Sequence, residues 1–154
     1  MAEEKYIEKL NELLMGENLA THIYRRTQGL QEDSQVAMML ERFKQDHDRH
    51  AEQLKQRITE LGGTPKTNMG MAGVMTNLSS TINSIRGPKH LLKQIYNGED
   101  KGVHAYEDRI DELDSESQDL VKQIMREDHD HLKYFKARME KEKKERNKDS
   151  SRLH

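Results

Sequence analysis

Gly16-Glu-Asn-Leu-Ala-Thr-His-Ile-Tyr24 and Gly98-Glu-Asp-Lys-Gly-Val-His-Ala-Tyr106 are two copies of one phrase. In each copy a glutamate follows the glycine, a histidine comes five residues after that glutamate, and a tyrosine comes seven residues after it. The second copy begins 82 residues after the first. A repeat at this spacing, in a chain with helical periodicity, predicts a duplicated helical hairpin.

Each copy is followed about 30 residues later by a cluster of acids and histidines. The first cluster is Asp46-His-Asp-Arg-His50, and the second is Glu127-Asp-His-Asp-His131. Carboxylate oxygens and imidazole nitrogens are common ligands of transition metals. The duplication therefore predicts a metal site to which both halves of the chain contribute.

The composition of the 154 residues favours long helices with a narrow apolar stripe and a wide charged face: 32% are hydrophobic, 35% are charged, and the formal net charge is −2. Nine methionines supplement the thin aliphatic content. The absence of cysteine excludes disulfides, thiolate zinc sites and iron–sulfur clusters from this chain. A near-neutral charge argues against general nucleic-acid binding.

The location expected for the protein is the cytoplasm. Its first residues, Met-Ala-Glu-Glu-Lys, have neither the basic nor the apolar region of a signal peptide. No apolar run approaches the length that crosses a membrane, so no membrane partner is expected.

Four long segments place apolar residues alternately three and four positions apart, which is the period of a left-handed helical bundle. Gly29, Gly62-Gly63 and Gly87-Pro88 mark helix boundaries, and Ser115-Glu-Ser-Gln118 fits a capping box before the fourth helix. The prediction is an all-α, antiparallel four-helix bundle over residues 1–140, built of two hairpins. Residues 141–154 form a charged C-terminal helix extension or tail.

A long crossover over residues 62–87 is expected to join the hairpins, with a short helix near Val74–Ile85. Met69, Met71 and Met75 in this segment are interpreted as adaptable packing residues.

Polar residues interrupt the apolar stripe of each helix near its middle. Burying such groups without partners costs several kcal/mol each, and a divalent metal would neutralise them. Residues three positions apart on a helix, such as His47 and His50, converge on one centre. Tyr24 and Tyr106 face inward and are expected to hydrogen-bond a ligand carboxylate. The predicted ligands, for iron, manganese or zinc, are Glu17, His47, His50, Glu99, Asp128 and His131.

Other acids and histidines of the repeat receive different predictions. His22 and His104 lie well round the helix from their glutamates, so we expect them at a helix edge or in solvent. Asp48 and His129 are expected to be exposed. Asp46 and Glu127 each lie four residues before a ligand histidine, and a small helix rotation would bring both to the metal. Asp46 and Glu127 are therefore less favoured candidate ligands.

The chain resembles the ferritin-like superfamily of carboxylate-bridged di-iron four-helix bundles. That pattern has a glutamate on helices 1 and 3, often with a tyrosine seven residues on, and Glu-x-x-His on helices 2 and 4. Glu17 with Tyr24, Glu99 with Tyr106, and the two histidines His50 and His131 match it. The resemblance covers residues 5–140. The Gly-Glu phrases and Leu61-Gly-Gly-x-Pro65 resemble a bacterial branch near the rubrerythrins.

The sequence departs from that pattern at the two bridging glutamates, where it has His47 and Asp128. Glu17, Glu99 and Asp128 would supply three negative charges against the four positive charges of two divalent ions. The second ion is therefore expected to bind more weakly, unless Asp46 or Glu127 joins the site.

The resemblance implies two ferrous ions, held between Glu17/His50 and Glu99/His131 and bridged by Asp128. The expected activity is that of a ferroxidase or a peroxide-reducing di-iron oxidoreductase, with oxygen or peroxide as oxidant. Because the chain lacks cysteine, electrons for a cycle would come from a separate partner, or the protein would act as a stoichiometric iron oxidant. A homodimer is the expected assembly.

The alternative from a different class is a non-catalytic bundle with a vestigial or single-metal site, acting as a stress-related or coat-associated interaction protein. A hemerythrin-like oxygen carrier fits poorly, because that fold needs more histidines and His-x-x-x-His spacing, whereas this chain has His47-x-x-His50.

Overall fold

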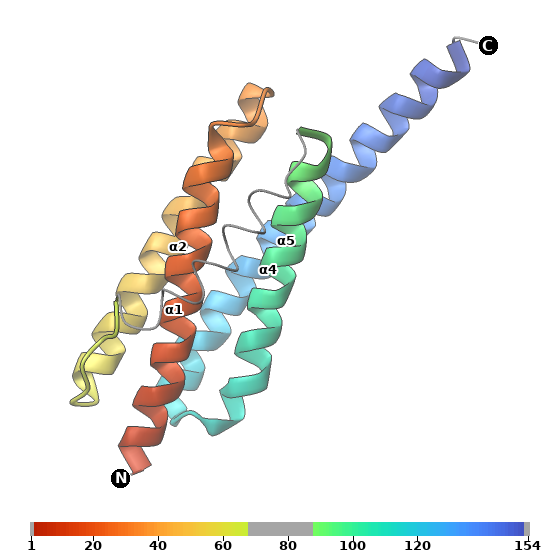
Figure 1. Ribbon diagram of the computed structural model, residues 1–154. Coiled ribbons are helices and arrows are strands. Elements are labelled where there is room, and N and C mark those ends of the chain that lie inside the picture. The colour runs from red at the N-terminus through yellow and green to blue at the C-terminus, as the bar shows by residue number, and fades with distance from the viewer. Residues whose placement is uncertain (1, 68–87, 153–154) are drawn as a thin grey trace.

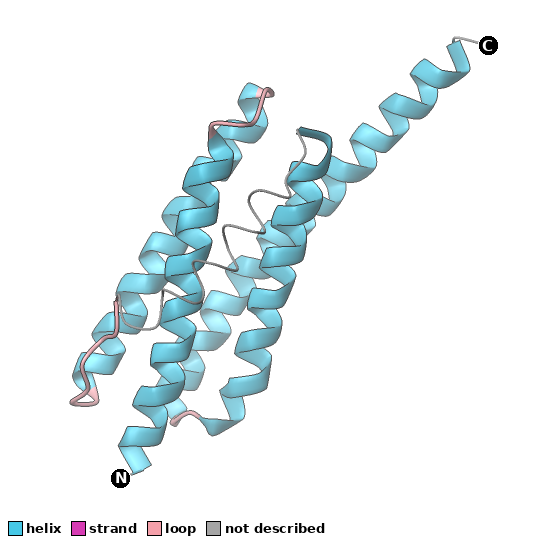
Figure 2. Cartoon of the chain, in the orientation of Figure 1, coloured by secondary structure: helices cyan, strands magenta, loops and turns pink. Residues whose placement is uncertain are grey.

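Four long helices make up nearly all of the structure, a computed structural model that describes residues 2–67 and 88–152 (Figure 1). No strand occurs among those residues (Figure 2). The elements, labelled as in Figure 1, are α1 (Ala2–Gln28), α2 (Ser34–Glu60), α4 (Pro88–Arg109), the 3₁₀ turn η1 (Ile110–Glu112) and α5 (Ser115–Arg152).

The helices pair as two antiparallel hairpins, α1 with α2 and α4 with α5 (Figure 1). Because α2 and α4 run in the same direction, the end of α2 and the start of α4 lie at opposite ends of the bundle. The predicted all-α four-helix bundle of two hairpins is therefore confirmed. The short helix predicted near residues 74–85, and the methionines of that segment, lie outside the described residues.

The helix ends follow local sequence signals. Gly29 follows α1, and Pro88 opens α4, as predicted. The Asp33 carboxylate caps α2 by accepting hydrogen bonds from the backbone N–H groups of Gln35 (2.9 Å) and Val36 (3.3 Å). The prediction was wrong at the fourth helix: α5 already begins at Ser115, so Ser115–Gln118 form its first turn.

Two apolar clusters fill the bundle, one towards each end. One contains Leu10, Leu14, Leu54, Ile58, Val121 and Ile124 among others. The other contains Val36, Leu40, Leu91, Leu92, Ile95 and Phe135 among others. The layer between them, near the middle of all four helices, contains the polar side chains described below.

Arginines on the bundle surface tie the two hairpins together. Arg57 near the end of α2 contacts Asp114 (2.6 Å) and Ser117 (3.0 Å) at the start of α5. Arg109 at the end of α4 donates to Glu12 of α1 (2.7 Å). These pairs connect the two hairpins, which helps to keep the helices in register.

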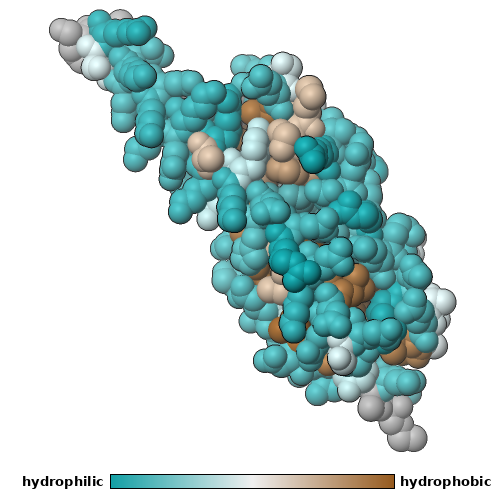
Figure 3. All heavy atoms as spheres, turned by 180° about the vertical axis from the view of Figure 1, so that it is seen from behind, coloured by the Kyte–Doolittle hydropathy of each residue, from teal (hydrophilic) through white to brown (hydrophobic). Residues whose placement is uncertain are grey.

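The last part of α5 projects beyond the other helices (Figure 1). Its residues after Glu140 are mostly charged and almost all exposed, in one helix continuous with the bundle. The rear surface of the molecule is largely hydrophilic, with small scattered apolar areas (Figure 3). None of the described helices has a stretch apolar and long enough to span a membrane.

Gly62 ends α2 in a left-handed conformation with φ of 86°. Its N–H donates to the carbonyl of Thr59 (3.0 Å), and the Gly63 N–H donates to that of Ile58 (2.9 Å), which is the Schellman pattern. We expect Gly62→Ala to lower the free energy of unfolding by about 1–2 kcal/mol, because an L side chain is strained there.

The matched control is Gly16→Ala, in the middle of α1, where an added Cβ would meet nothing within 4 Å. It should instead stabilise the protein, by about 0.5–1 kcal/mol. Urea denaturation of both variants measures the two effects. A change in the free energy of unfolding with the same sign in both variants would contradict the assignment of strain to Gly62.

Candidate metal centre

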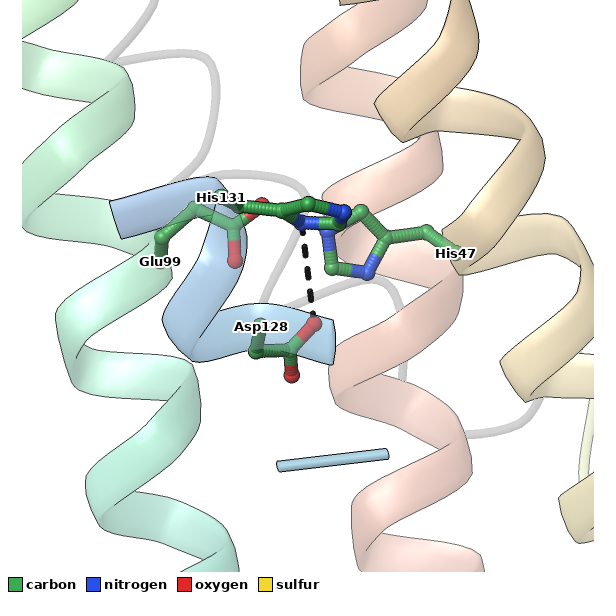
Figure 4. Close-up of side chains that lie close together, drawn as sticks. All are labelled: His47, Glu99, Asp128 and His131. Carbon is green, nitrogen blue, oxygen red and sulfur yellow. Dashed lines mark hydrogen bonds and ion pairs between the residues drawn. The ribbon is translucent and has the colours of Figure 1, made fainter. Parts of the chain in front are cut away.

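Six ionisable side chains from all four helices meet in one layer of the core. Their exposed fractions range from 0% to 6%, so the whole layer is shielded from solvent. Figure 4 shows four of them turned towards one another from α2, α4 and α5. The structure thus brings together all six residues that the sequence predicted as ligands: Glu17, His47, His50, Glu99, Asp128 and His131.

His47 lies between the two glutamates of the repeat. Its Nδ1 is 2.6 Å from Oε2 of Glu17, and its Nε2 is 2.6 Å from Oε1 of Glu99. The ring of His47, which belongs to α2, therefore links Glu17 of α1 to Glu99 of α4. The ring tilts against Tyr24, with the ring centroids 5.2 Å apart, so packing holds it in place.

The other two histidines each direct Nδ1 into the layer. His50 Nδ1 lies 3.6 Å from Oε1 of Glu17, and His131 Nδ1 lies 3.2 Å from Oε1 of Glu99. Both also approach Oδ1 of Asp128, at 3.8 Å and 3.7 Å. Two half-sites result, one with Glu17 and His50 and the other with Glu99 and His131, and Asp128 lies within reach of both histidines.

Asp46 and Glu127 occupy positions different from those considered for them in the sequence. Asp46 contacts the outer Nε2 of His131 (2.8 Å), and Glu127 contacts the outer Nε2 of His50 (2.6 Å). Each acid lies on the side of the histidine that is away from the core glutamates. It thus holds a histidine of the opposite hairpin with Nδ1 pointing inward. Carboxylate–histidine pairs of this kind fix the tautomer and orientation of a ligand histidine.

Arg49 joins these two acids at the surface and was not predicted as part of the site. Its guanidinium contacts Asp46 at 3.3 Å and also donates to Glu127. The spacing of Asp46 and Arg49, three residues apart on one helix, is visible in the sequence. The contact with Glu127 depends on how α2 and α5 pack, and no local pattern indicates it.

Phe43 is a second contributor that sequence reasoning missed. Its ring stacks on His131, with centroids 4.0 Å apart and an interplanar angle of 28°. Phe43 belongs to the apolar cluster on one side of the polar layer. It closes that side of the site against water.

The two tyrosines donate hydrogen bonds across the hairpins. Tyr106 of α4 donates to Oε1 of Glu17 on α1 (2.6 Å), and Tyr24 of α1 donates to Oε1 of Glu99 on α4. Burial, together with the charge of Glu17 near Tyr106 and of Glu99 near Tyr24, raises the pKa of both phenols well above 10. Both therefore remain neutral hydrogen-bond donors.

His47 and the two glutamates form a buried charged triad. Burial alone would raise the pKa of Glu17, but the positive charge and hydrogen bond of His47 lower it to about 2. The pKa of Glu99 is likewise held far below its ordinary value, against burial, by His47 and His131. Burial disfavours charge on His47, yet the Glu99 and Glu17 charges raise its pKa well above 6.5. In the absence of a metal, His47 is a cation between two anions.

Asp128 behaves in the opposite way. Burial raises its pKa to about 8, and the negative charges of Glu17 and Glu99 contribute to the rise. Its Oδ1 has no hydrogen-bond partner among the described residues, and neither has Nδ1 of His50. Buried polar atoms without partners are rare in folded proteins, and an ion bound between these two atoms would pair both.

The donor atoms fit metal ions. One set, His47, Glu99, Asp128 and His131, has ligand atoms within 4.8 Å of one another, as does a second set, Glu17, His47 and His50. Ligands bound to one ion at 2.0–2.2 Å lie roughly 3–3.5 Å from each other. The separations of 3.2 Å (His131–Glu99) and 3.6 Å (His50–Glu17) are close to that spacing. The oxygen and nitrogen donors suit iron, manganese or zinc.

The remaining acids and histidines of the repeat lie outside the layer. His104 is exposed and pairs with Glu107 (3.1 Å) on its own helix, and His129 is also exposed. His22 is half-buried. Asp48 is partly exposed and pairs with Lys44 (3.1 Å). These positions agree with the places expected for them.

Comparison with known families gives one match: residues 5–112, more than half of the chain, match the model described as domain of unknown function DUF2383. The chain belongs to the DUF2383 family. No curated protein sequence matches this DUF2383 chain significantly.

Solved structures similar to the DUF2383 chain are ferritin-like. A bacterioferritin of Desulfovibrio desulfuricans, described with a diiron site in different catalytic states, is 24% identical over 90% of this chain and 80% of its own, with a TM-score of 0.77. A ferritin-like, diiron-carboxylate protein from Bacillus anthracis is 20% identical over 90% of this chain and 98% of its own, with a TM-score of 0.71.

A third similar structure is a dodecameric thioferritin, the bacterioferritin-related protein of Bacteroides fragilis. It is 20% identical over 95% of this chain and 90% of its own, with a TM-score of 0.81. At these identities the similarity establishes the fold, and the ferritin-like fold predicted from the sequence is confirmed.

Proposed function

We propose that this protein binds two ferrous ions in the polar layer and oxidises them with peroxide or oxygen. The observation that carries the proposal is the pair of donor sets, His47/Glu99/Asp128/His131 and Glu17/His47/His50, buried at one level of a ferritin-like bundle. Similar solved structures described as diiron proteins support iron as the metal. Manganese and zinc suit the same donors.

The residues of the chain have separate roles in this activity. Glu17 and Glu99 supply anionic oxygens and, with His50 and His131, orient each ion. The tyrosine hydroxyls keep both glutamates fixed through hydrogen bonds. The apolar clusters on either side exclude water from the layer. A dry site strengthens the electrostatic interactions within it.

Electron and proton balance determine what else the reaction needs. Two ferrous ions each lose one electron, and peroxide accepts both electrons with two protons to give two water molecules. The chain has no cysteine and therefore no thiolate iron centre of its own to return those electrons. Repeated turnover uses a separate electron donor, whereas without one the protein oxidises iron stoichiometrically.

A non-catalytic bundle is the second candidate, and one observation favours it. His47 contacts Glu17 and Glu99 at 2.6 Å each, so a protonated imidazole pairs with both glutamates without any metal and offsets one of their two negative charges. The counter-observation is that Asp128 Oδ1 and His50 Nδ1 have no partner in that arrangement. Leaving each atom unpaired costs about 1–3 kcal/mol, and an ion bound between them would remove that cost.

Anaerobic loading with ferrous iron, followed by elemental analysis and then by addition of peroxide, tests the proposal. We expect two irons per chain and iron oxidation faster than in buffer alone. His131→Ala should lose at least one iron and the rate enhancement, because it removes a donor buried at 2% exposure. His104→Ala, an exposed histidine on α4, is the control and should change neither value. Protein that binds no iron would favour the non-catalytic bundle.

A further inference from the structure

His47 differs from the other two core histidines in how its ring nitrogens are used. His50 and His131 each turn Nε2 outward to an acid near the surface, at 2.6 Å and 2.8 Å. Both nitrogens of His47 point instead at core carboxylates, Nδ1 at Glu17 and Nε2 at Glu99. His47 is also the one residue common to the two donor sets of the layer.

We propose that His47 bridges the two metal ions as an imidazolate, with Nδ1 bound to the ion of the Glu17 half-site and Nε2 bound to the ion of the Glu99 half-site. The inference rests on the proposed function, because it concerns the same two ions. It replaces the carboxylate bridge that the sequence analysis assigned to Asp128.

The positions of the neighbouring donors support this assignment. Nδ1 of His47 faces Glu17 and its Nε2 faces Glu99. The donor sets group His50 with Glu17 and His47, and His131 with Glu99 and His47. Each ring nitrogen is 2.6 Å from its glutamate oxygen. Binding of an ion requires these two atoms to separate to roughly 3 Å, the spacing of adjacent ligands with bonds of 2.0–2.2 Å. The carboxylate oxygen must also move off the axis of the ring-nitrogen lone pair, because the ion itself occupies that axis.

Asp128 then belongs to one half-site. It forms a donor set with His47, Glu99 and His131, whereas the other set consists of Glu17, His47 and His50. The ion of the Glu99 half-site gains an additional carboxylate. We therefore expect that ion to bind first and more tightly, and the Glu17 half-site to keep an open coordination position.

Charge balance gives an independent argument. Glu17, Glu99 and Asp128 carry three negative charges when ionised, and two divalent ions carry four positive charges. An imidazolate at His47 adds the fourth negative charge in a layer where each of these residues is at most 6% exposed. The ring gives up its N–H protons to solvent as the two metal–nitrogen bonds form. Release of protons on metal binding is general for ligands of this kind.

The bridge makes a geometric prediction that separates it from an oxygen-bridged pair. Metal–nitrogen bonds of about 2 Å on opposite sides of one ring place the ions roughly 6 Å apart. Two-metal sites bridged by carboxylate or oxygen have ions about 3.5–4 Å apart.

Copper(II) is a suitable probe, because nitrogen and oxygen donors bind it well and each ion carries one unpaired electron. The protein is loaded to saturation, bound copper is counted by elemental analysis, and electron paramagnetic resonance is recorded. We expect two coppers per chain and a spin-coupled pair, whose half-field line gives a separation of about 6 Å. His47→Gln should abolish the coupling, and His104→Gln should preserve it.

Each outcome of the copper experiment supports or overturns the His47 bridge. A coupled pair near 6 Å that depends on His47 supports the bridge. A separation of about 3.5–4 Å, uncoupled ions, one ion per chain, or coupling that persists in His47→Gln overturns it. Two ions without the bridge leave the proposed function standing, whereas no bound metal overturns both. The wild-type spectrum alone decides if His47→Gln fails to fold.

Discussion

Glu99→Ala is expected to lower the free energy of unfolding of the metal-free protein by about 3–5 kcal/mol, the usual cost of removing one partner from a buried ion pair. Glu99 contacts His47 at 2.6 Å and His131 at 3.2 Å and accepts a hydrogen bond from Tyr24. Its loss leaves three buried polar groups without their acceptor. Chemical denaturation in the presence of a chelator measures the change.

The same substitution separates metal binding from structural support. A ligand that binds only the folded protein raises stability by about 2.7 kcal/mol at one hundred times its dissociation constant. Wild-type protein should show such an increase with ferrous iron under anaerobic conditions, and Glu99→Ala should show little or none. An equal loss of stability with and without metal would identify Glu99 as a purely structural hydrogen-bonding group.

Glu107→Ala is the matched control. Glu107 lies on the same helix, eight residues further on, and pairs with exposed His104. Surface ion pairs of this kind contribute little to stability. Its removal should leave both the free energy of unfolding and the effect of metal essentially unchanged.

Asp128→Asn is expected to have the opposite effect on the metal-free protein, stabilising it at pH 8 by several kcal/mol, because each unit of pKa shift corresponds to about 1.4 kcal/mol. The pKa of Asp128 rises from 3.8 to about 8 on folding, because burial and the nearby Glu17 and Glu99 disfavour its charge. The folded state therefore holds a proton that the unfolded state has lost. Stability from this group is present below pH 3.8 and declines as the pH rises to about 8.

Asparagine has no proton to lose, so the gain should grow from pH 5 to pH 8, and thermal or urea denaturation at both values measures it. The same variant should bind metal more weakly, because it removes an anionic donor of the Glu99 half-site. Asp130→Asn, at an exposed acid two residues further along α5, is the control and should change neither the stability nor the metal binding. A loss of stability at pH 8 would contradict the raised pKa of Asp128.

The whole pH profile of the metal-free protein follows from the same groups. The pKa of Glu17 is lowered from 4.5 to about 2, so its stabilising contribution is present above pH 4.5 and is lost as the pH falls through 2. The pKa of His47 is raised well above 6.5, so its contribution is present below pH 6.5 and is lost at alkaline pH. Because the contribution of Asp128 already declines above pH 3.8, maximal stability is expected near pH 4.5, with a decline towards higher pH.

Much of the fold was predictable, because its signals are local. The alternation of apolar residues determines which face of each helix is buried, and Gly29, Gly62 and Pro88 end or begin helices through their own backbone preferences. The start of α5 was placed incorrectly. Ser115–Gln118 has the composition of a capping box, yet these residues form the first helical turn.

The gathering of the six polar residues was also predictable from the sequence. Each of them interrupts an apolar stripe near mid-helix, and the duplication places equivalent residues on both hairpins. Their roles as metal ligands remain predictions. So do the oxidant, the electron donor, the homodimer and the boundary at residue 140.

The sequence by itself determined the helices, the inward stripes and which polar side chains would be buried, because helical periodicity is a property of each segment alone. Only the tertiary structure decided which atoms meet. His47 contacts both glutamates. The outer acids Asp46 and Glu127 hold the histidines of the opposite hairpin. Tyr24 of α1 donates to the glutamate of α4, and Tyr106 of α4 donates to the glutamate of α1. These contacts depend on the rotation and register of one helix against another, which packing sets in three dimensions and no single segment encodes.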